Sequence, residues 1–327
     1  MHMRHVIIDT DPGIDDSIAI LLASTHPEVC IDALTTVGGN VPLEKTTANA
    51  LGILNFAKAG DIPVYQGAAH PLAGAAEQYA DDTHGESGTG QVHLDPADRK
   101  IAGTDAPQFI VDHTKAHPGE ITLVPIGPLT NIAKALEIDP TLPERVPEVL
   151  LMGGAEGPGN VTPSAEFNFW FDPEAAAAVM NAGFKKITLV GLDATEQAFI
   201  TAGTRELLRR LSDSKNAQFL YQITQQYADF YWDTQKALGA ELCDVLAIAK
   251  LIDDSLVETE SASIEIALDG ICRGRSQVAR KKRFPSLPQN GHICTNVNTR
   301  GFFELLLTTL IPEEKELIEQ VLAHEYR

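Results

Sequence analysis

Short apolar runs alternate with helix-like segments along the first two-thirds of the chain. Runs of strand-like length cover residues 6–8, 31–37, 63–65, 121–126, 149–152 and 187–190. Apolar positions at helical spacing predict helices from residue 14 onward, over 43–59 and 106–117, after residue 131 and after residue 173. Such alternation is typical of a parallel sheet with helices on its faces. It predicts one α/β domain over residues 1–327, with a Rossmann-like, mixed but mainly parallel central sheet flanked by helices.

Beyond residue 190 the pattern turns mainly helical. Helices are predicted over 202–211, 217–236 and 244–252 and in two terminal segments. One strand-like run covers 262–268, and we interpret the basic run at 280–283 as a solvated loop. Two stretches, 67–100 and 157–171, have little periodicity. Loops this long in compact domains are usually functional lids or disordered, which leaves open whether residues 67–100 close over a site.

The first predicted strand and helix are joined by a segment that is unusually rich in acids. The run DTDPGIDD, residues 9–16, places Asp9 and Asp11 at the end of the strand and Asp15 and Asp16 in the first turn of the helix. Open α/β sheets bind their ligands at this edge. One aspartate is enough to cap a helix, so four indicate a bound cation. Carboxylate oxygens suit Ca²⁺ or Mg²⁺, and no nearby His/Cys cluster points to zinc.

The geometry of the two elements divides the acids further. Asp9 and Asp11 are two residues apart on an extended segment, so they share a face and could both approach the cation. Successive helical residues point about 100° apart, so Asp15 and Asp16 cannot serve one ligand identically. One of them could bind the metal while the other faces a substrate.

Composition narrows the classes of partner. The formal charge of −20, from 25 basic and 45 acidic residues, argues against a nucleic-acid or anionic-membrane partner. No segment approaches the ~18 consecutive apolar residues of a membrane span. The four cysteines form no C-x-x-C pair, and the apolar run of a signal peptide is lacking at the start. We therefore expect reduced thiols and a cytoplasmic location.

Six short motifs occur in a characteristic order. They are DTDPGIDD at 9–16, TVGGN at 36–40, GPLTN at 127–131, MGG at 152–154, AEFNF at 165–169 and DPEAA at 172–176. In order and spacing the chain resembles the nucleoside hydrolases, which cleave the N-glycosidic bond of ribonucleosides. The resemblance covers most of the chain. It implies the nucleoside hydrolase fold, a ribonucleoside substrate, a Ca²⁺ cofactor and a homotetramer or homodimer.

The resemblance also implies roles for individual residues. Ca²⁺ would be held by Asp11, Asp16, the backbone carbonyl of Ile126 and the distant Asp244, while Asp9 would support this set from behind. Asp11 would also be the general base that takes a proton from a metal-bound water. The residues implied in substrate binding are Asp15, Asn40, Met152, Asn160, Glu166, Phe167 and Asn168. An anionic pocket of this kind suits the oxocarbenium-like transition state of glycosidic cleavage.

The position before Asp244 departs from the pattern of the family. Many relatives have a histidine there that helps to protonate the departing base, whereas this chain has Cys243, as a subgroup of the family does. A thiol with the ordinary pKa of ~8.5 is a poor acid at neutral pH, and Cys243 could equally be inert filler. Tyr227 and Tyr231, four apart on one predicted helix, are candidates for this role or for core packing. By the resemblance His84 would lie in a loop that closes over the site, but it could also be merely solvated.

Two alternatives remain open from the sequence. A haloacid-dehalogenase-like phosphohydrolase would use Asp9 as nucleophile and Asp11 as acid/base, but that class lacks the following P-G-x-D-D block. A nucleoside- or ribose-binding protein without turnover would keep the same pocket. Base preference, purine or pyrimidine, is not determined by these motifs.

Overall fold

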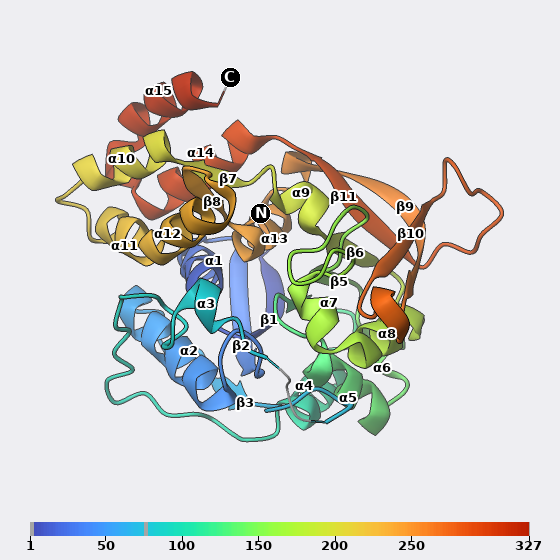
Figure 1. Ribbon diagram of the computed structural model, residues 1–327. Coiled ribbons are helices and arrows are strands. Elements are labelled where there is room, and N and C mark those ends of the chain that lie inside the picture. Colours follow the sequence, from blue (N-terminus) through green and yellow to red (C-terminus); the bar gives the residue numbers. More distant parts are fainter. Residues whose placement is uncertain (1–2, 75–77, 327) are drawn as a thin grey trace.

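The apolar runs that the sequence predicts as strands lie side by side in one sheet. The computed structural model describes residues 3–74 and 78–326, and within them nine strands follow the order β10-β9-β11-β6-β5-β4-β1-β2-β3 (Figure 1). The parallel strands are β1 (Arg4–Thr10), β2 (Val29–Thr36), β3 (Val64–Gln66), β4 (Ile121–Pro125), β5 (Val149–Met152), β6 (Ile187–Val190) and β11 (Gly291–Val297). Antiparallel strands β9 (Val257–Ile266) and β10 (Ser276–Arg280) complete one edge. The predicted mixed, mainly parallel sheet is confirmed.

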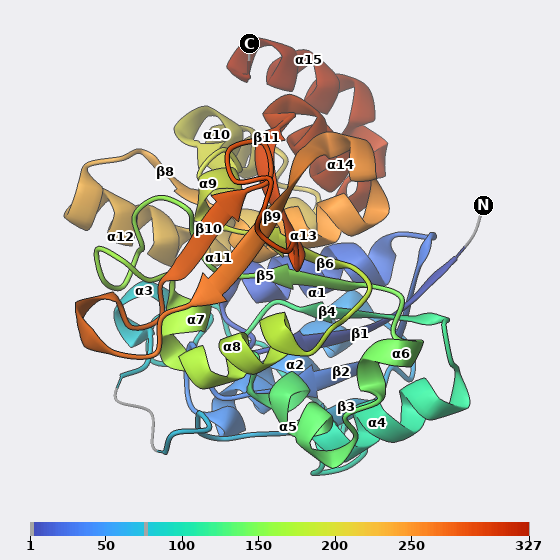
Figure 2. The same cartoon turned by 90° about the vertical axis from the view of Figure 1, so that its right-hand side faces the viewer.

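Helices cover both faces of this sheet because successive strand residues point to opposite sides. Val6 and Ile8 of β1 pack in one apolar cluster, whereas Ile7 packs in the other. The first cluster joins the sheet to α1 (Ile14–Thr25), α2 (Leu43–Ala57), α13 (Cys243–Ile252) and α14 (Thr299–Leu310). The second joins it to α4 (Ala106–Ala116), α5 (Thr130–Ile138) and α8 (Pro173–Asn181), which lie in front of the strands in Figure 2.

A mainly helical region lies on the side of the sheet that carries the first apolar cluster (Figure 1). It contains α10 (Ala202–Arg210), α11 (Lys215–Ile223), α12 (Gln225–Gln235), α15 (Lys315–Glu325) and a two-stranded sheet of β7 (Phe199–Thr201) and β8 (Gly239–Glu241). The single helix predicted over 217–236 is wrong, because the helix is interrupted at Thr224, which separates α11 from α12. The Thr224 hydroxyl donates to the Leu220 carbonyl at 2.7 Å and accepts from the buried Arg205 guanidinium.

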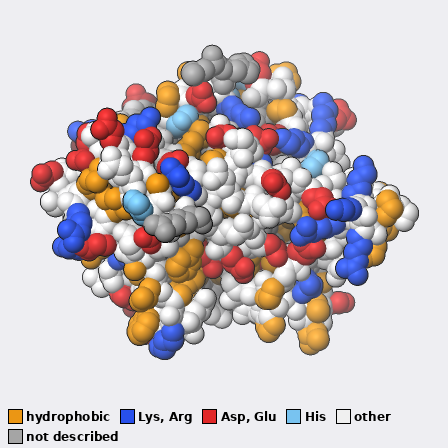
Figure 3. Space-filling view, turned by 90° about the horizontal axis from the view of Figure 1, so that it is seen from above, with side chains coloured by type: hydrophobic (Ala, Val, Ile, Leu, Met, Phe, Trp, Pro, Cys, Tyr) orange, Lys and Arg blue, Asp and Glu red, His pale blue; other side chains and the backbone are white. Residues whose placement is uncertain are grey.

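Shorter elements fill the connections. They are α3 (Asp81–His84), α6 (Leu142–Arg145), α7 (Phe167–Phe171), α9 (Leu192–Thr195), η1 (Asp254–Leu256), η2 (Gly270–Cys272) and η3 (Pro312–Glu314). Among the described residues, no helix is both long and apolar enough to cross a bilayer. On the face shown in Figure 3, basic side chains lie in separate groups among acidic ones.

The edge formed by β9, β10 and β11 departs most from the sequence prediction. The strand expected over 262–268 covers Val257–Ile266, and β10 and β11 were not predicted. Both short strands depend on pairing with β9 rather than on their own apolar content. The solvated loop predicted at 280–283 is wrong for Arg280, which ends β10 and pairs with Glu156 and Glu260, and is confirmed for the exposed residues 281–283.

Candidate active site

The predicted acid cluster forms at the carboxyl end of β1. Asp9, Asp11, Asp15 and Asp16 are each at most 4% exposed. Asp244 joins them from the first turn of α13, and it is equally buried. Carboxylate oxygens of Asp15, Asp16 and Asp244 lie within 4.8 Å of one another. Residues more than 200 positions apart in the sequence therefore share one buried site.

The oxygens of these carboxylates differ in their hydrogen bonds. Asp16 accepts from the Thr10 hydroxyl at 2.6 Å and from the Gly13 N–H at 2.9 Å. Asp11 accepts from the Asn40 N–H at 2.7 Å through Oδ2, whereas its Oδ1 is buried with no hydrogen-bond partner. A buried oxygen that accepts no hydrogen bond is costly unless something else compensates its charge.

Two glycines of the sequence motifs make room for the Asp11 carboxylate. A Cβ atom on Gly39 would lie 2.0 Å from Asp11 Oδ2, and one on Gly127 would lie 2.5 Å from Asp11 Oδ1. Any side chain at these positions would displace the carboxylate. The glycines in the motifs TVGGN and GPLTN are thus explained in part by the close approach of the backbone to the Asp11 carboxylate.

Burial and mutual repulsion disfavour the charged forms of the cluster. Burial, followed by the neighbouring carboxylates, raises the pKa of Asp11 and of Asp244 well above the ordinary value. The same causes raise the pKa of Asp16 to about 6. No lysine or arginine is among the described residues that line the adjoining cavity, so protein cations do not compensate these acids.

These residues fit a bound cation with oxygen ligands. Asp11 offers its unpartnered Oδ1, and Asp16 and Asp244 lie close to one another. The Ile126 carbonyl lines the cavity and accepts one hydrogen bond, from Asn168 Nδ2 at 3.0 Å, which leaves a lone pair. Asp15 is closer to this group than the sequence suggested, and its oxygens accept hydrogen bonds from Tyr227 and from the Asp244 N–H. Both oxygens of Asp16 accept hydrogen bonds as well, so this feature alone does not separate the two acids.

A cavity of about 530 Å³ opens beside the cluster. Its lining includes nearly all the residues singled out from the sequence: Asp11, Asp15, Asn40, His84, Ile126, Met152, Asn160, Glu166, Phe167, Asn168, Tyr227, Tyr231, Cys243 and Asp244. Asp16 and Asp9 are fully buried and are not part of this lining. Asp9 accepts hydrogen bonds from Thr35 and Asn131. The sequence motifs thus converge on one cavity.

One side of the cavity is built around Glu166 and Asn168. Glu166 accepts backbone hydrogen bonds from Gly154 at 2.8 Å, Phe169 at 3.1 Å and Asn168 at 2.8 Å. Burial nevertheless raises the Glu166 pKa to about 7. Asn168 donates to the carbonyls of Ile126 and Met152. Asn160 contributes by accepting from the Phe167 N–H at 2.9 Å.

His84 and Tyr227 form a second side of the cavity. Because Nδ1 of His84 accepts from the Ile14 N–H at 3.1 Å, its neutral ring carries the proton on Nε2, which lies 3.2 Å from the Tyr227 hydroxyl. Tyr227 in turn donates to Asp15 at 2.5 Å. Burial lowers the His84 pKa to about 4, which keeps this ring neutral. His84 is only 6% exposed, so the alternative of a merely solvated loop residue is wrong.

Tyr231, Cys243 and Glu241 line a third side. Burial and the nearby Glu241 carboxylate raise the pKa of both Tyr231 and Cys243. Tyr231 lies beside Glu241, and Cys243 Sγ is 4.0 Å from the Glu241 carboxylate. Burial raises the Glu241 pKa to about 7. Sequence reasoning missed Glu241, since a lone glutamate two residues before Cys243 carries no local signal.

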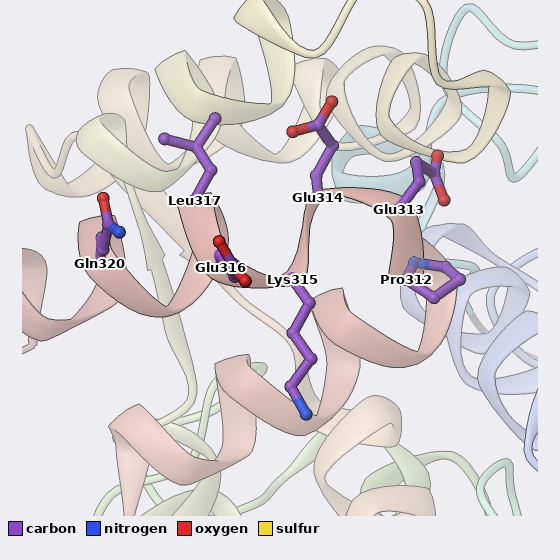
Figure 4. A pocket seen from close by; sticks show the side chains of 7 residues that line it. All are labelled: Pro312, Glu313, Glu314, Lys315, Glu316, Leu317 and Gln320. Atoms are coloured by element: carbon purple, nitrogen blue, oxygen red, sulfur yellow. The ribbon is translucent and has the colours of Figure 1, made fainter.

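A second hollow, of about 510 Å³, lies at the start of α15 (Figure 4). Its lining comes from one continuous segment, residues 312–320, with three glutamates and one lysine. It brings together no residues from distant elements. We therefore place the chemistry in the cavity beside Asp11.

Comparison with known proteins agrees with this geometry. A family model described as inosine-uridine preferring nucleoside hydrolase matches residues 6–304. The chain belongs to the nucleoside hydrolase family. Family membership makes the protein an N-glycosyl hydrolase of ribonucleosides, as the sequence predicted, and it rules out the phosphohydrolase alternative.

Individual members of the family resemble the chain over most of its length. The inosine-uridine preferring nucleoside hydrolase of Leishmania major is 42% identical over 269 residues, 82% of this chain and 84% of that protein. The pyrimidine-specific ribonucleoside hydrolase RihB of Shigella sonnei is 34% identical over 307 residues, 94% of this chain and 96% of that protein. The structure of the plant nucleoside hydrolase PpNRh1 superposes with a TM-score of 0.88 at 37% identity, covering 94% of this chain and 98% of that one.

Proposed function

We propose that this hydrolase requires Ca²⁺ and cleaves purine or pyrimidine ribonucleosides to ribose and the free base. The observation that supports the cation most directly is the buried, unpartnered Oδ1 of Asp11 within a cluster of carboxylates. Asp11, Asp16, Asp244 and the Ile126 carbonyl would hold the ion. Three carboxylates and a carbonyl suit Ca²⁺ better than Mg²⁺, which keeps most of its water ligands.

A bound Ca²⁺ would supply positive charge that acidifies an adjacent water molecule. Asp11 would act as the general base, because it lines the cavity and its Oδ1 accepts no hydrogen bond from the protein. A cation beside it would lower the raised Asp11 pKa and keep the carboxylate ionised at neutral pH. The water would attack as the bond to the base breaks.

Asp15, Asn40, Glu166 and Asn168 would bind and orient the ribose. Each is buried and lines the cavity with a polar group. The carboxylates among them would also stabilise the positive charge that develops on the ribose ring. Because buried polar groups left without partners are costly, deoxyribonucleosides should be poor substrates.

Glu241 fits the role of acid for the leaving base better than the residues suggested by the sequence. Its pKa of about 7 allows the carboxyl group to deliver a proton near neutral pH. The raised pKa values of Tyr231 and Cys243 make both weaker acids, and His84 is neutral and already hydrogen-bonded. Tyr231, which lies beside Glu241, would help to position it.

The finer expectations about specificity and assembly belong to this proposal. Aromatic side chains of Phe167, Trp170 and Phe230 line the cavity and offer surfaces on which a purine or a pyrimidine could stack. A cytoplasmic homotetramer or homodimer remains our expectation. The four cysteines are unpaired, which suits a reducing compartment.

The proposal is tested by incubating the protein with inosine, uridine and cytidine, with Ca²⁺ or after chelation, and measuring reducing sugar. We expect ribose from at least one nucleoside, and only with Ca²⁺. Asp11→Asn should lower kcat by about 10²–10⁴-fold, the usual range for loss of a general base. The matched control is Asp98→Asn, at an exposed position outside the cavity, which should keep full activity. Calorimetric binding of nucleosides without any release of ribose would instead support the non-catalytic binder.

A further inference from the structure

A second cluster of metal-ligating side chains lies at the opposite end of β1. His5 and Cys30 are register partners on the adjacent parallel strands β1 and β2, and Asp32 follows Cys30 by two residues, at an irregularity where the register skips Asp32. The imidazole nitrogen of His5, the thiol sulfur of Cys30 and a carboxylate oxygen of Asp32 all lie within 4.8 Å of one another. Five strand residues lie between His5 and Asp11, which puts the two residues roughly 20 Å apart.

Helix α4 adds a fourth group to this cluster. His113 Nε2 lies 2.7 Å from Asp32 Oδ2, while His5 Nδ1 lies 2.8 Å from Asp32 Oδ1. The Asp32 carboxylate is thus held between two histidines. Burial acts to raise the Asp32 pKa, but the two histidine hydrogen bonds outweigh it and keep the pKa below its ordinary value. Asp32 is therefore ionised at neutral pH.

The accessibility of the four side chains allows an ion to enter. The Asp32 side chain is 10% exposed, His113 is 21% exposed and His5 is 45% exposed, and Cys30 is partly buried. The cluster is therefore neither sealed in the core nor fully in solvent. A third histidine, His117, lies beyond His113, with 4.8 Å between the ring centres and an angle of 44° between the ring planes. Nitrogen and sulfur ligands thus dominate this end of the sheet, in contrast to the oxygen ligands around Asp11.

We propose that His5, Cys30 and Asp32 bind a divalent ion of the Zn²⁺ class, at a site distinct from the catalytic cavity. One imidazole, one thiolate and one carboxylate are ligands that Zn²⁺ prefers, and water would complete a tetrahedral set. On binding, the Cys30 thiol releases its proton to solvent as the sulfur–metal bond forms. The thiolate and the Asp32 carboxylate together balance the two positive charges of the ion. Asp32 would ligate through Oδ1, and His113 would hold it by donating to Oδ2.

The site would join the start of β1 to β2 and to α4. An ion bound only by the folded protein stabilises it by mass action, so Zn²⁺ should raise Tm. Because binding releases a thiol proton, the affinity should rise with pH.

Titration with Co²⁺, in excess Ca²⁺ that occupies the oxygen-lined site, tests the proposal on the intact enzyme. We expect one Co²⁺ per chain with a thiolate-to-cobalt charge-transfer band, and competition by Zn²⁺ should abolish that band. Cys30→Ser should lose the band and keep full nucleosidase activity. Cys243→Ser, which removes the thiol beside the catalytic cavity, should keep the band. His113→Gln should weaken Co²⁺ binding by about 10-fold or more, because it removes the support of a ligand.

Two results would overturn the proposal. One is the absence of a thiolate band in the unaltered enzyme, and the other is a band that survives Cys30→Ser and disappears in Cys243→Ser. If Cys30→Ser does not fold, Asp32→Asn decides the question, since it should lose Co²⁺ affinity at least 10-fold. Failure of the nucleosidase assay would leave this metal test unaffected, because the two sites share no residue.

Discussion

Individual carboxyl groups in the cavity differ in how fully the protein already engages them. Both oxygens of Asp15 accept hydrogen bonds, whereas Asp11 keeps Oδ1 without a partner. Glu241 is different again, because it lies beside Tyr231 and Cys243, and the Asp15 charge is only a minor cause of its raised pKa. The division of labour that we propose follows from these contacts: Asp11 for the cation and water, Asp15 for ribose and Glu241 for the leaving base.

The role of Glu241 predicts a dependence on the leaving group. Glu241→Gln cannot donate a carboxylic proton, so kcat/KM for inosine or uridine should fall by about 10²-fold. The rate with p-nitrophenyl β-D-ribofuranoside should change much less, since nitrophenolate departs without protonation. Steady-state kinetics on both substrates provide the measurement, and Cys243→Ser and Cys243→His are informative companions. An equal loss on the two substrates would show that Glu241 only supports the fold of the cavity.

At the scale of elements, residues at the beginnings of helices form hydrogen bonds that hold the carboxyl ends of the strands in place. Asn131, in the first turn of α5, donates to Asp9 at 2.8 Å and to the Thr36 carbonyl at 3.0 Å, and it accepts from the Ala68 N–H at 2.8 Å. Asp172 caps α8 through the Ala175 N–H and also accepts from the Thr130 hydroxyl at 2.6 Å. Two of the motifs thus hold elements together instead of contacting a substrate.

This arrangement predicts a large effect of Asn131→Ala on stability. The change leaves the Ala68 N–H without its partner in the interior and removes one of the two hydrogen bonds that Asp9 Oδ1 accepts, so the free energy of unfolding should fall by roughly 2–4 kcal/mol. Asn181→Ala removes a single bond to the Ala177 carbonyl at an exposed position of α8, and it should cost no more than about 0.5 kcal/mol. Urea unfolding of both variants gives the comparison. Equal effects would mean that Asn131 is not a structural link.

At the scale of the whole molecule, the carboxyl groups couple stability to pH and to the cation. Burial is the chief cause of the raised pKa values of several carboxyls, among them Asp9, Asp11, Asp16, Glu166, Glu241 and Asp244. Without metal, the folded protein holds protons that the unfolded chain has already released. Its stability should therefore fall as pH rises from about 4 to about 7.

One buried group acts in the opposite direction. The His84 pKa is lowered to about 4, so this residue adds stability as pH rises from about 4 to 6.5, but it is a single group against several carboxyls. Ca²⁺ should therefore raise Tm more at about pH 7.5 than at about pH 5, because at the lower pH protons compete with the ion. Thermal unfolding with Ca²⁺ and with chelator measures both shifts. Asp11→Asn should remove most of the shift at the higher pH, and equal shifts at the two pH values would contradict the prediction.

The sequence alone determined the parts that depend on neighbouring residues. The strand, turn and helix that carry Asp9 to Asp16 follow from a local apolar pattern, and the predicted bounds of α2 and α4 differ from the structure by at most two residues. Resemblance of the motifs to a family then brought Asp244 and Ile126 to the same cavity. The family match and the observed sheet confirm what these local signals predicted.

Only the tertiary structure decided features that depend on contacts between distant segments. Strand β10 exists through pairing with β9, and β11 exists through pairing with β9 and β6. Glu241 reaches the cavity because β8 pairs with β7. A series of hydrogen bonds that runs from the Ile14 N–H through His84 and Tyr227 to Asp15 joins three separate parts of the chain. His5, Cys30, Asp32 and His113 meet for the same reason. Burial and pKa depend on everything that surrounds a side chain, and no window of sequence contains those surroundings.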